Sequence, residues 1–206
     1  MKEPIELRTT QLEQFLQCPF HYKYPKPASK KQGLGTYMHE MIQEYLLDTT
    51  DENYDLVKDK ISRDNSKELS WLYHWLYLSK SIHQQEKVEV KVTKEIVIDD
   101  QPIILSGTID CVDPDGNISD LKTSQWRWNN FILKDKIQSL VYSWLWEKNK
   151  TFTYYVFTKH KKPQLQVLEK EIDYWFCDQK IKEWLKRFIQ YNEKDDRECT
   201  RRLFCK

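Results

Sequence analysis

The sequence of 206 residues holds 33 Lys and Arg against 32 Asp and Glu, so its formal net charge is +1. This balance excludes nucleic-acid binding driven by bulk positive charge, and any such contact must rest on local basic patches. Aromatic residues make up 14% of the chain, which excludes a disordered protein, and a total of 4 Gly argues against a Gly-rich nucleotide-binding fold.

The chain is expected to form a single cytoplasmic domain without a membrane span. No run of about 18 apolar residues occurs, and the N-terminal residues lack the apolar core of a signal peptide. An odd total of 5 Cys without such a leader argues against a disulfide framework. Within residues 1–206 we expect a helical N-terminal part over about 1–84, a catalytic α/β core over about 85–175, and a C-terminal helix with a Cys-containing tail over 176–206.

Apolar residues at helical spacing dominate the N-terminal part. A capping box at Thr10–Glu13 is expected to open a short helix, and longer helices are expected over about Gly35–Leu47 and Lys67–His83. Pro25–Gln32 is expected to be a basic loop. The acidic stretch Asp48–Asp59 is expected to be a solvated connection.

Beyond residue 84 the pattern changes from helical to alternating. The expected elements are strands over Val88–Val92, Ile103–Val112 and Ile118–Thr123, an aromatic loop over Ser124–Asn130, a helix ending at Trp146, strands over Thr151–Thr158 and Leu165–Ile172, and a helix over about Asp178–Tyr191. The turn Asp113–Gly116 joins the second strand to the third. This order predicts a mixed α/β layer fold.

Two carboxylates and a lysine are expected to meet near that turn. Asp110 lies near the end of one strand, and Asp120 and Lys122 project from the same face of the next. Two neighbouring carboxylates repel each other unless a cation lies between them or one is protonated, and Mg²⁺ accepts such oxygen ligands. A lysine beside the metal can orient or deprotonate an attacking water, or stabilise charge on phosphorus. The three residues therefore suit hydrolysis of a phosphodiester.

The alternative is a solvated strand face, because Asp-x-Lys arises by chance in a chain in which 32% of the residues are charged. Further motifs favour the metal site. His39 follows Gly35 by four residues on an expected helix, and Gln138 and Tyr142 lie on one face of another.

In chain order the motifs are Cys18-Pro19-x-x-Tyr22-x-Tyr24, Gly35-x-x-x-His39, Gly107-x-Ile109-Asp110, Asp120-x-Lys122 and Gln138-x-x-x-Tyr142. This series resembles the RecB-like nucleases of the PD-(D/E)xK superfamily, in particular the CRISPR-associated RecB-like exonucleases and the AddB nuclease domain. The resemblance covers about residues 10–145 and, in a weaker form, the C-terminus. It implies a PD-(D/E)xK restriction-endonuclease-like α/β fold, which is a mixed sheet flanked by helices.

The resemblance also implies a metal site for Mg²⁺ or Mn²⁺, whose ligands would be His39, Asp110, Asp120 and the backbone carbonyl of Leu121. Lys122 would be the catalytic lysine beside the attacking water, and Gln138 and Tyr142 would position the DNA strand. The alternatives are an ordinary helix histidine at 39 and an ordinary polar helix flank at 138 and 142.

Some of these relatives carry a [4Fe–4S] cluster held by one N-terminal and three C-terminal cysteines. In this sequence Cys18, Cys199 and Cys205 match three of the positions, and Asp196 stands where the fourth Cys is expected. Thiolates are the usual iron ligands. A cluster with an unusual fourth ligand, another metal, and thiols without metal therefore all stay open, and Cys177 is a further candidate ligand.

Local basic segments could hold DNA. They are His21–Lys31, Lys159–Lys162 and Arg201-Arg202. Trp126 and Trp128 follow Lys122 closely and could stack on unpaired bases, as the aromatic residues of single-strand binders do. The alternative is that the tryptophans fill the core and the lysines lie in solvated loops.

The leading hypothesis is a metal-dependent deoxyribonuclease, expected to act as an exonuclease on single-stranded or frayed DNA in recombination, repair or CRISPR-type DNA processing. The resemblance implies products with a 5′-phosphate and a 3′-hydroxyl. Two alternatives stay open: a non-catalytic DNA-binding module of a larger complex, and a nuclease acting on RNA. Because no helicase motif is present, helicase or DNA-processing partners would be separate proteins.

Overall fold

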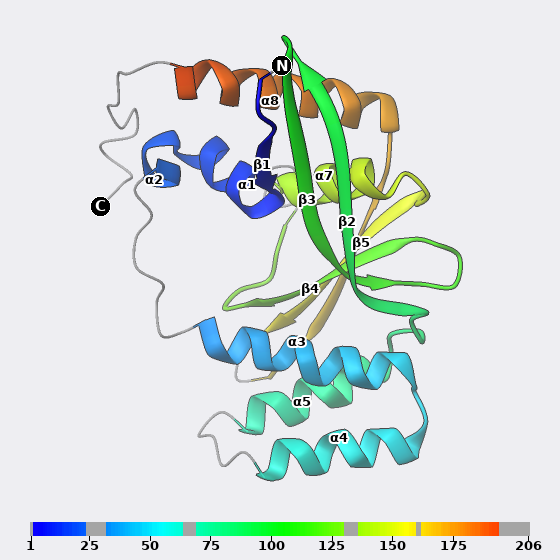
Figure 1. The fold of residues 1–206 in the computed structure, drawn as a ribbon. Coiled ribbons are helices and arrows are strands. Elements are labelled where there is room, and N and C mark those ends of the chain that lie inside the picture. The colour runs from blue at the N-terminus through cyan, green and yellow to red at the C-terminus, as the bar shows by residue number, and fades with distance from the viewer. Residues whose placement is uncertain (1, 24–31, 64–68, 130–135, 160–161, 194–206) are drawn as a thin grey trace.

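The computed structural model describes residues 2–23, 32–63, 69–129, 136–159 and 162–193 (Figure 1). Its elements are β1 (Ile5–Arg8), α1 (Thr9–Gln17), α2 (Pro19–Lys23), α3 (Gln32–Leu47), α4 (Asp51–Arg63), α5 (Leu69–Ser79), β2 (Lys87–Ile98), β3 (Gln101–Val112), β4 (Ile118–Ser124), α7 (Ile137–Trp146), β5 (Thr151–Thr158), β6 (Leu165–Glu171) and α8 (Tyr174–Glu193). Within these ranges no helix is long and apolar enough to span a bilayer.

The strands form one mixed sheet of six, in the order β1-β3-β4-β5-β6, with β2 paired to β3. The β1–β3 and β4–β5 pairs are parallel, and the β2–β3, β3–β4 and β5–β6 pairs are antiparallel. Helices flank this sheet, with α3, α4 and α5 grouped at one end of the molecule and α1, α7 and α8 at the other (Figure 1). The expected fold class, a mixed sheet flanked by helices, is confirmed.

Two hydrophobic cores lie against the sheet. In β5, Tyr154 and Val156 belong to the core beneath α1, α7 and α8, whereas Phe157 belongs to the core beneath α3, α4 and α5. Alternate residues of a strand point to opposite faces, so the two cores cover opposite faces of β5. In β3, Ile109 packs in the first core and Cys111 in the second, with Asp110 between them.

One edge of β3 is shared by β1 and β4, which leaves a gap between them. β1 pairs with β3 as far as Ser106, and β4 pairs with it only at Cys111 and Val112. Residues 107–110 therefore have no strand partner on this edge within the described part of the chain. We call this segment the β3 opening, and it positions the site described below.

The β2–β3 hairpin is longer than the alternating pattern predicted. β2 continues to Ile98, and the turn at Asp99 and Asp100 has φ values of 47° and 63°. Positive φ at both central residues is the geometry of a type I′ turn, which suits the twist of a hairpin.

The expected solvated connection over Asp48–Asp59 is wrong, because α4 occupies Asp51–Arg63. Val57 and Ile61 are four residues apart and fully buried, so the segment has the apolar stripe that a packed helix needs. The hydroxyl of Thr50 accepts a hydrogen bond from the backbone N–H of Asn53 and caps the helix.

The capping box expected at Thr10–Glu13 forms two residues earlier, between Arg8 and Gln11. Arg8 is the N-cap of α1, and its backbone N–H donates to Oε1 of Gln11 at 2.9 Å. Glu13 therefore takes no part in the cap, and it lies within electrostatic reach of Lys122 and Asp120. β1 was not predicted, because it is four residues long and buries only Leu7.

Candidate active site

Asp110 and Asp120 meet where β3 and β4 separate. Cys111 pairs with Ser119, and the same register carried one residue further sets Asp110 opposite Asp120. The Asp110 carboxylate crosses to β4 and accepts a hydrogen bond from the backbone N–H of Leu121 at 2.8 Å. The turn after β3 thus brings the two carboxylates together.

Lys122 is ion-paired to Asp120. Its Nζ lies 2.9 Å from Oδ1 and 2.8 Å from Oδ2 of that carboxylate, which belongs to a residue only 2% exposed. The approach to Oδ2 is a close ion pair without hydrogen-bond geometry, since this buried oxygen has no hydrogen-bond donor. One oxygen of a buried carboxylate therefore keeps unused capacity to bind a cation.

The two acids and the lysine shift one another's protonation. Burial, reinforced by the neighbouring Asp120, raises the pKa of Asp110 well above its ordinary value. Burial acts to lower the pKa of Lys122, but the Asp120 and Asp110 carboxylates outweigh it and the pKa is raised overall. Lys122 is therefore a fixed cation beside a carboxyl group that resists ionisation.

His39 reaches this group from α3. Its Nδ1 lies 3.6 Å from Oδ2 of Asp110, and the Leu121 backbone nearby acts to raise the pKa of the ring. Burial lowers the pKa of His39, although Asp120 acts in the opposite direction. A neutral imidazole is the form that binds metal ions.

A second residue of α3 supports the strand that carries Asp110. The buried side chain of Gln43 donates a hydrogen bond of 3.0 Å from Nε2 to the backbone carbonyl of Asp110. Met38 and Ile42 hold α3 in the core beneath it. The position of His39 therefore follows from packing that the helical spacing of apolar residues predicted.

The donors fit a hard divalent cation. The ring of His39 lies near the Asp110 carboxylate, and Asp120 stands across from it on β4; Mg²⁺ or Mn²⁺ accepts donors of these types. In the described ranges no group of three His, Cys, Asp or Glu side chains lies close enough together to hold a metal ion without rearrangement. The arrangement is an open one, in which Lys122 holds Asp120 and Leu121 holds Asp110.

Two further acids, Glu89 and Glu13, border the site. The sequence alone did not predict either of them there. Val88 pairs with Cys111 and Val90 with Ile109, so Glu89 of β2 stands opposite Asp110, with φ of 51°. Glu89 helps to raise the pKa of Asp110. The Val-Glu-Val alternation predicts that Glu89 faces solvent. Its position near Asp110 follows only from the register of the hairpin.

The second acid is Glu13 of α1. Burial raises its pKa, while Lys136 and Lys122 act to lower it and Asp120 acts to raise it. The sequence pattern predicts a capping role for Glu13. Nothing else in the neighbouring sequence indicates that Glu13 lies near Lys122.

Tyr142 of α7 reaches the β3 opening. A Cβ atom at Gly107 would lie 2.6 Å from Cε1 of Tyr142 and 2.7 Å from Oγ1 of Thr9, so only glycine allows this approach. Burial and the nearby Asp120 and Asp110 raise the pKa of the Tyr142 phenol. Gln138, one turn earlier in α7, is also buried.

The two tryptophans after β4 differ in their surroundings. Trp126 is 68% exposed. Trp128 is clamped by Gln166, which bonds both its N–H and its carbonyl at 2.9 and 2.7 Å, and its ring packs against Tyr154 and beneath the ammonium of Lys136. Trp126 is the better placed of the two to meet a ligand.

The cysteines are described only in part. Cys18 caps the C-terminus of α1 and is buried, whereas Cys199, Cys205 and Asp196 lie outside the described residues. Cys177 is fully buried in α8, and burial raises the pKa of its thiol to about 11, which disfavours the thiolate that a metal would need. Of the basic segments, residues 24–31, 160–161 and 201–202 also lie outside the described ranges.

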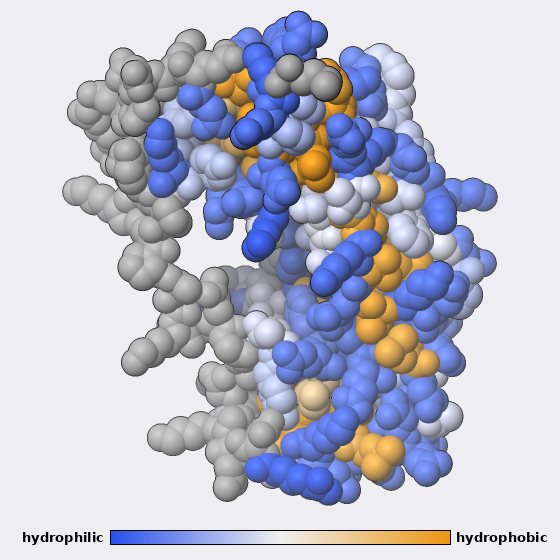
Figure 2. Space-filling view, in the orientation of Figure 1, coloured by the Kyte–Doolittle hydropathy of each residue, from blue (hydrophilic) through white to orange (hydrophobic). Residues whose placement is uncertain are grey.

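The surface between α1 and α3 is hollowed beside the β3 opening (Figure 2). Polar residues predominate around this hollow in the view shown. The site therefore has an open side from which a ligand can approach.

Comparison with known proteins places this geometry in a family. The model of the PD-(D/E)XK nuclease superfamily matches residues 7–205. The solved structure of SSO0001 is similar with a TM-score of 0.55 and 14% identity, covering 100% of this chain and 88% of that one. A candidate exonuclease from Eubacterium rectale is similar with a TM-score of 0.59 and 13% identity, covering 97% of this chain and 86% of that one. At these identities the two structures show a shared fold. No curated protein matches the sequence.

Proposed function

The chain belongs to the PD-(D/E)XK nuclease superfamily, and from this membership we propose that it is a metal-dependent deoxyribonuclease of the RecB-like type. The observation that carries the proposal is the meeting of Asp110, Asp120, Lys122 and His39 at the β3 opening. A protein that had kept the fold only for binding would not need a lysine paired with a buried acid beside a second acid. The whole of residues 1–206 would form the one nuclease domain.

Asp110, Asp120, His39 and the Leu121 carbonyl would hold Mg²⁺ or Mn²⁺. Such an ion supplies Lewis-acid chemistry, in that it polarises a phosphoryl oxygen and lowers the pKa of a bound water. The buried Asp120 carboxylate supports this assignment, because its Oδ2 receives no hydrogen bond beside its ion pair with Lys122 and can accept a further cation.

Lys122 would act as a cation and not as a base. Its raised pKa keeps the ammonium charged, so it can hold the attacking water by hydrogen bonding and stabilise negative charge that develops on the phosphoryl oxygens. Water would add to phosphorus and the 3′-oxygen would leave, giving a 5′-phosphate and a 3′-hydroxyl. Tyr142 and Gln138 would position the strand beside the scissile bond.

Single-stranded DNA is the proposed substrate, and exonucleolytic cleavage the proposed mode. The exposed Trp126, which lies just beyond β4, supports this choice, because exposed aromatic rings bind unpaired bases by stacking. Helicase or DNA-processing proteins would act as separate partners. A [4Fe–4S] cluster joining Cys18 to Cys199 and Cys205 is a further proposal that rests on sequence alone.

A gel assay tests the proposed function. Single-stranded DNA, duplex DNA and RNA, each labelled at one end or the other, are incubated with Mg²⁺, Mn²⁺ or EDTA, beside the variant Lys122→Ala. Shortening of single-stranded DNA that needs the metal and is lost in the variant supports the proposal and shows the polarity. DNA binding without cleavage under every condition would instead identify a non-catalytic module, and preferred cleavage of RNA would identify a ribonuclease.

A further inference from the structure

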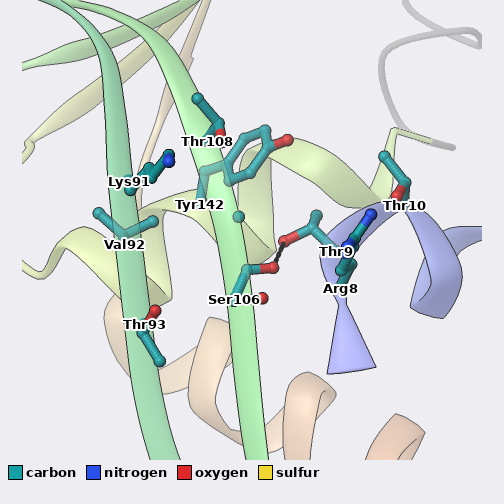
Figure 3. A pocket seen from close by; sticks show the side chains of 10 residues that line it. Arg8, Thr9, Thr10, Lys91, Val92, Thr93, Ser106, Thr108 and Tyr142 are labelled. Carbon is teal, nitrogen blue, oxygen red and sulfur yellow. Dashed lines mark hydrogen bonds between the residues drawn. The ribbon is translucent and has the colours of Figure 1, made fainter. Parts of the chain in front are cut away.

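A pocket of about 390 Å³ lies where β1 passes into α1, against the β2–β3 hairpin (Figure 3). Arg8 and Lys91 bring positive charge to it, and Thr10, Thr93, Ser106 and Thr108 bring hydroxyl groups. No carboxylate is among the residues that line it. Lining of this kind suits an anion that accepts several hydrogen bonds.

The two cations are available to a ligand. Among the ion pairs of the described ranges none uses Arg8 or Lys91, although most other lysines of the surface near β2 are paired, such as Lys87 with Glu86 and Lys94 with Glu147. The corner of the pocket is held by Thr9, whose hydroxyl donates to the carbonyl of Ser106 at 3.0 Å (Figure 3). The pocket therefore has one fixed corner at Thr9, with Arg8 beside that corner and Lys91 across from it (Figure 3).

The pocket adjoins the active site along the same hairpin. Thr93 pairs with Ser106 and Lys91 with Thr108, and the position two residues further on holds Glu89 opposite Asp110. A step of two residues along a strand is about 7 Å. This is close to the separation of neighbouring phosphates in an extended strand of nucleic acid.

Tyr142 joins the two places. Its ring lines the pocket beside Gly107, and its phenol lies within electrostatic reach of Asp110 and Asp120. A strand whose scissile phosphate lay at the carboxylates would thus pass Tyr142 before its next phosphate reached Lys91.

We propose that the Arg8–Lys91 pocket binds the backbone phosphate next to the scissile one. The inference rests on the proposed function and adds to it a binding subsite whose residues contact substrate without taking part in the chemistry. Because phosphate contacts carry no base identity, the subsite would fix the register of the strand and leave its sequence unread. The same chemistry would accept a terminal phosphate at the end of a strand.

Binding measurements test the subsite separately from cleavage. The probe is a fluorescently labelled single-stranded oligodeoxynucleotide in EDTA, titrated with wild-type protein, Arg8→Gln, Lys91→Gln and the control Lys87→Gln, which removes a charge from the same strand outside the pocket. We expect each pocket variant to weaken binding about tenfold and to lower the salt dependence of log K by about one counterion, whereas the control changes neither.

Substituted probes identify the phosphate. Oligonucleotides carrying one uncharged methylphosphonate linkage at successive positions should bind wild-type protein more weakly at a single position, and Lys91→Gln should be insensitive to that substitution. Probes with and without a 5′-phosphate distinguish an internal from a terminal phosphate. If both pocket variants bind like Lys87→Gln while wild-type protein cleaves DNA, the subsite is wrong and the nuclease stands. If wild-type protein neither binds nor cleaves nucleic acid, the proposed function fails and the subsite fails with it.

Discussion

The side-chain amide of Gln43 donates its hydrogen bond to the backbone carbonyl of Asp110 at 3.0 Å, and so ties α3 to the strand that carries a proposed metal ligand. His39 lies one turn earlier in the same helix. This polar contact between helix and strand therefore helps to set the distance between His39 and Asp110, two of the proposed metal ligands.

Replacing Gln43 by Leu should lower cleavage more than it lowers stability. The loss of one buried hydrogen bond costs about 1 kcal/mol in the free energy of unfolding, which chemical denaturation measures. Cleavage should fall by at least about tenfold, because Asp110 is no longer held against His39. The matched control is Gln84→Leu, which removes a similar bond to the Leu47 carbonyl on the exposed side of the protein. Equal cleavage by the two variants would show that the Gln43 hydrogen bond is not needed to position Asp110.

Replacing Lys122 by Gln should abolish most cleavage without abolishing DNA binding. The amide is polar but one atom shorter than the lysine side chain and carries no charge, and the loss of one such stabilising group costs about 100-fold or more in kcat. Single-turnover cleavage measures the loss, and oligonucleotide binding in EDTA is the companion measurement. Cleavage within a few-fold of wild type would show that Lys122 serves only to pair with Asp120.

Without metal, the protein should lose stability as pH rises. The folded-state pKa of Asp110 is raised from 3.8 to about 7, so between these values the folded state binds more protons than the unfolded state. The contribution of Asp110 to stability is therefore fully present below this window and is lost as pH rises through it. His39, whose pKa is lowered, contributes a slope of the opposite sign.

Comparison with Asp110→Asn isolates the acid from the histidine. Denaturation in EDTA at successive pH values should give a wild-type curve that falls relative to the variant between pH 4 and about 7. Parallel curves would show that Asp110 ionises normally in the folded protein.

Gly107→Ala should displace Tyr142 and weaken cleavage. The new methyl group would lie 2.6 Å from the Tyr142 ring and 2.7 Å from the Thr9 hydroxyl, and overpacking of this kind costs about 1–3 kcal/mol. Gly116→Ala is the control, because Gly116 has φ of 81° but open space around it. That variant should lose stability through backbone strain and keep full activity. Thermal unfolding and the cleavage assay together separate the two effects.

If the proposed [4Fe–4S] cluster is present, protein purified without oxygen should contain iron and absorb visible light, and Cys18→Ala should lower both. Elemental analysis and absorbance spectra measure this. The same iron content in wild type and variant, or none in either, would count against the cluster.

The sequence predicted those parts of the site that are formed by residues close together along the chain. Asp120 and Lys122 are two residues apart on one strand, and the turn at 113–116 returns that strand to Asp110, so local pattern was enough to anticipate their meeting. Glu89 could not be placed in the same way. Its position opposite Asp110 depends on a hairpin turn at Asp99 and Asp100 whose two acids gave no strong turn signal.

Elements that are stabilised mainly by tertiary contacts were also missed. β1 pairs in parallel with residues nearly 100 positions away along the chain. α4 has only a narrow apolar stripe, and its many acidic residues favoured the prediction of a solvated connection. The helical spacing that located α3 and α7 was sufficient because both carry broad apolar faces.

Residues of β3 on either side of Asp110 pack in different cores, with Ile109 in one and Cys111 in the other, so the site lies between the two cores. His39 moves with the packing around Trp75 and Met38, whereas Tyr142 moves with the packing around Phe188 and Val141. A cavity opened deep in either core would therefore misalign the two sides of the site without touching any residue in it. Conversely, a DNA strand that contacts both sides of the site would link the two cores. Hydrogen exchange in α3 and in α7 should therefore slow together when DNA binds.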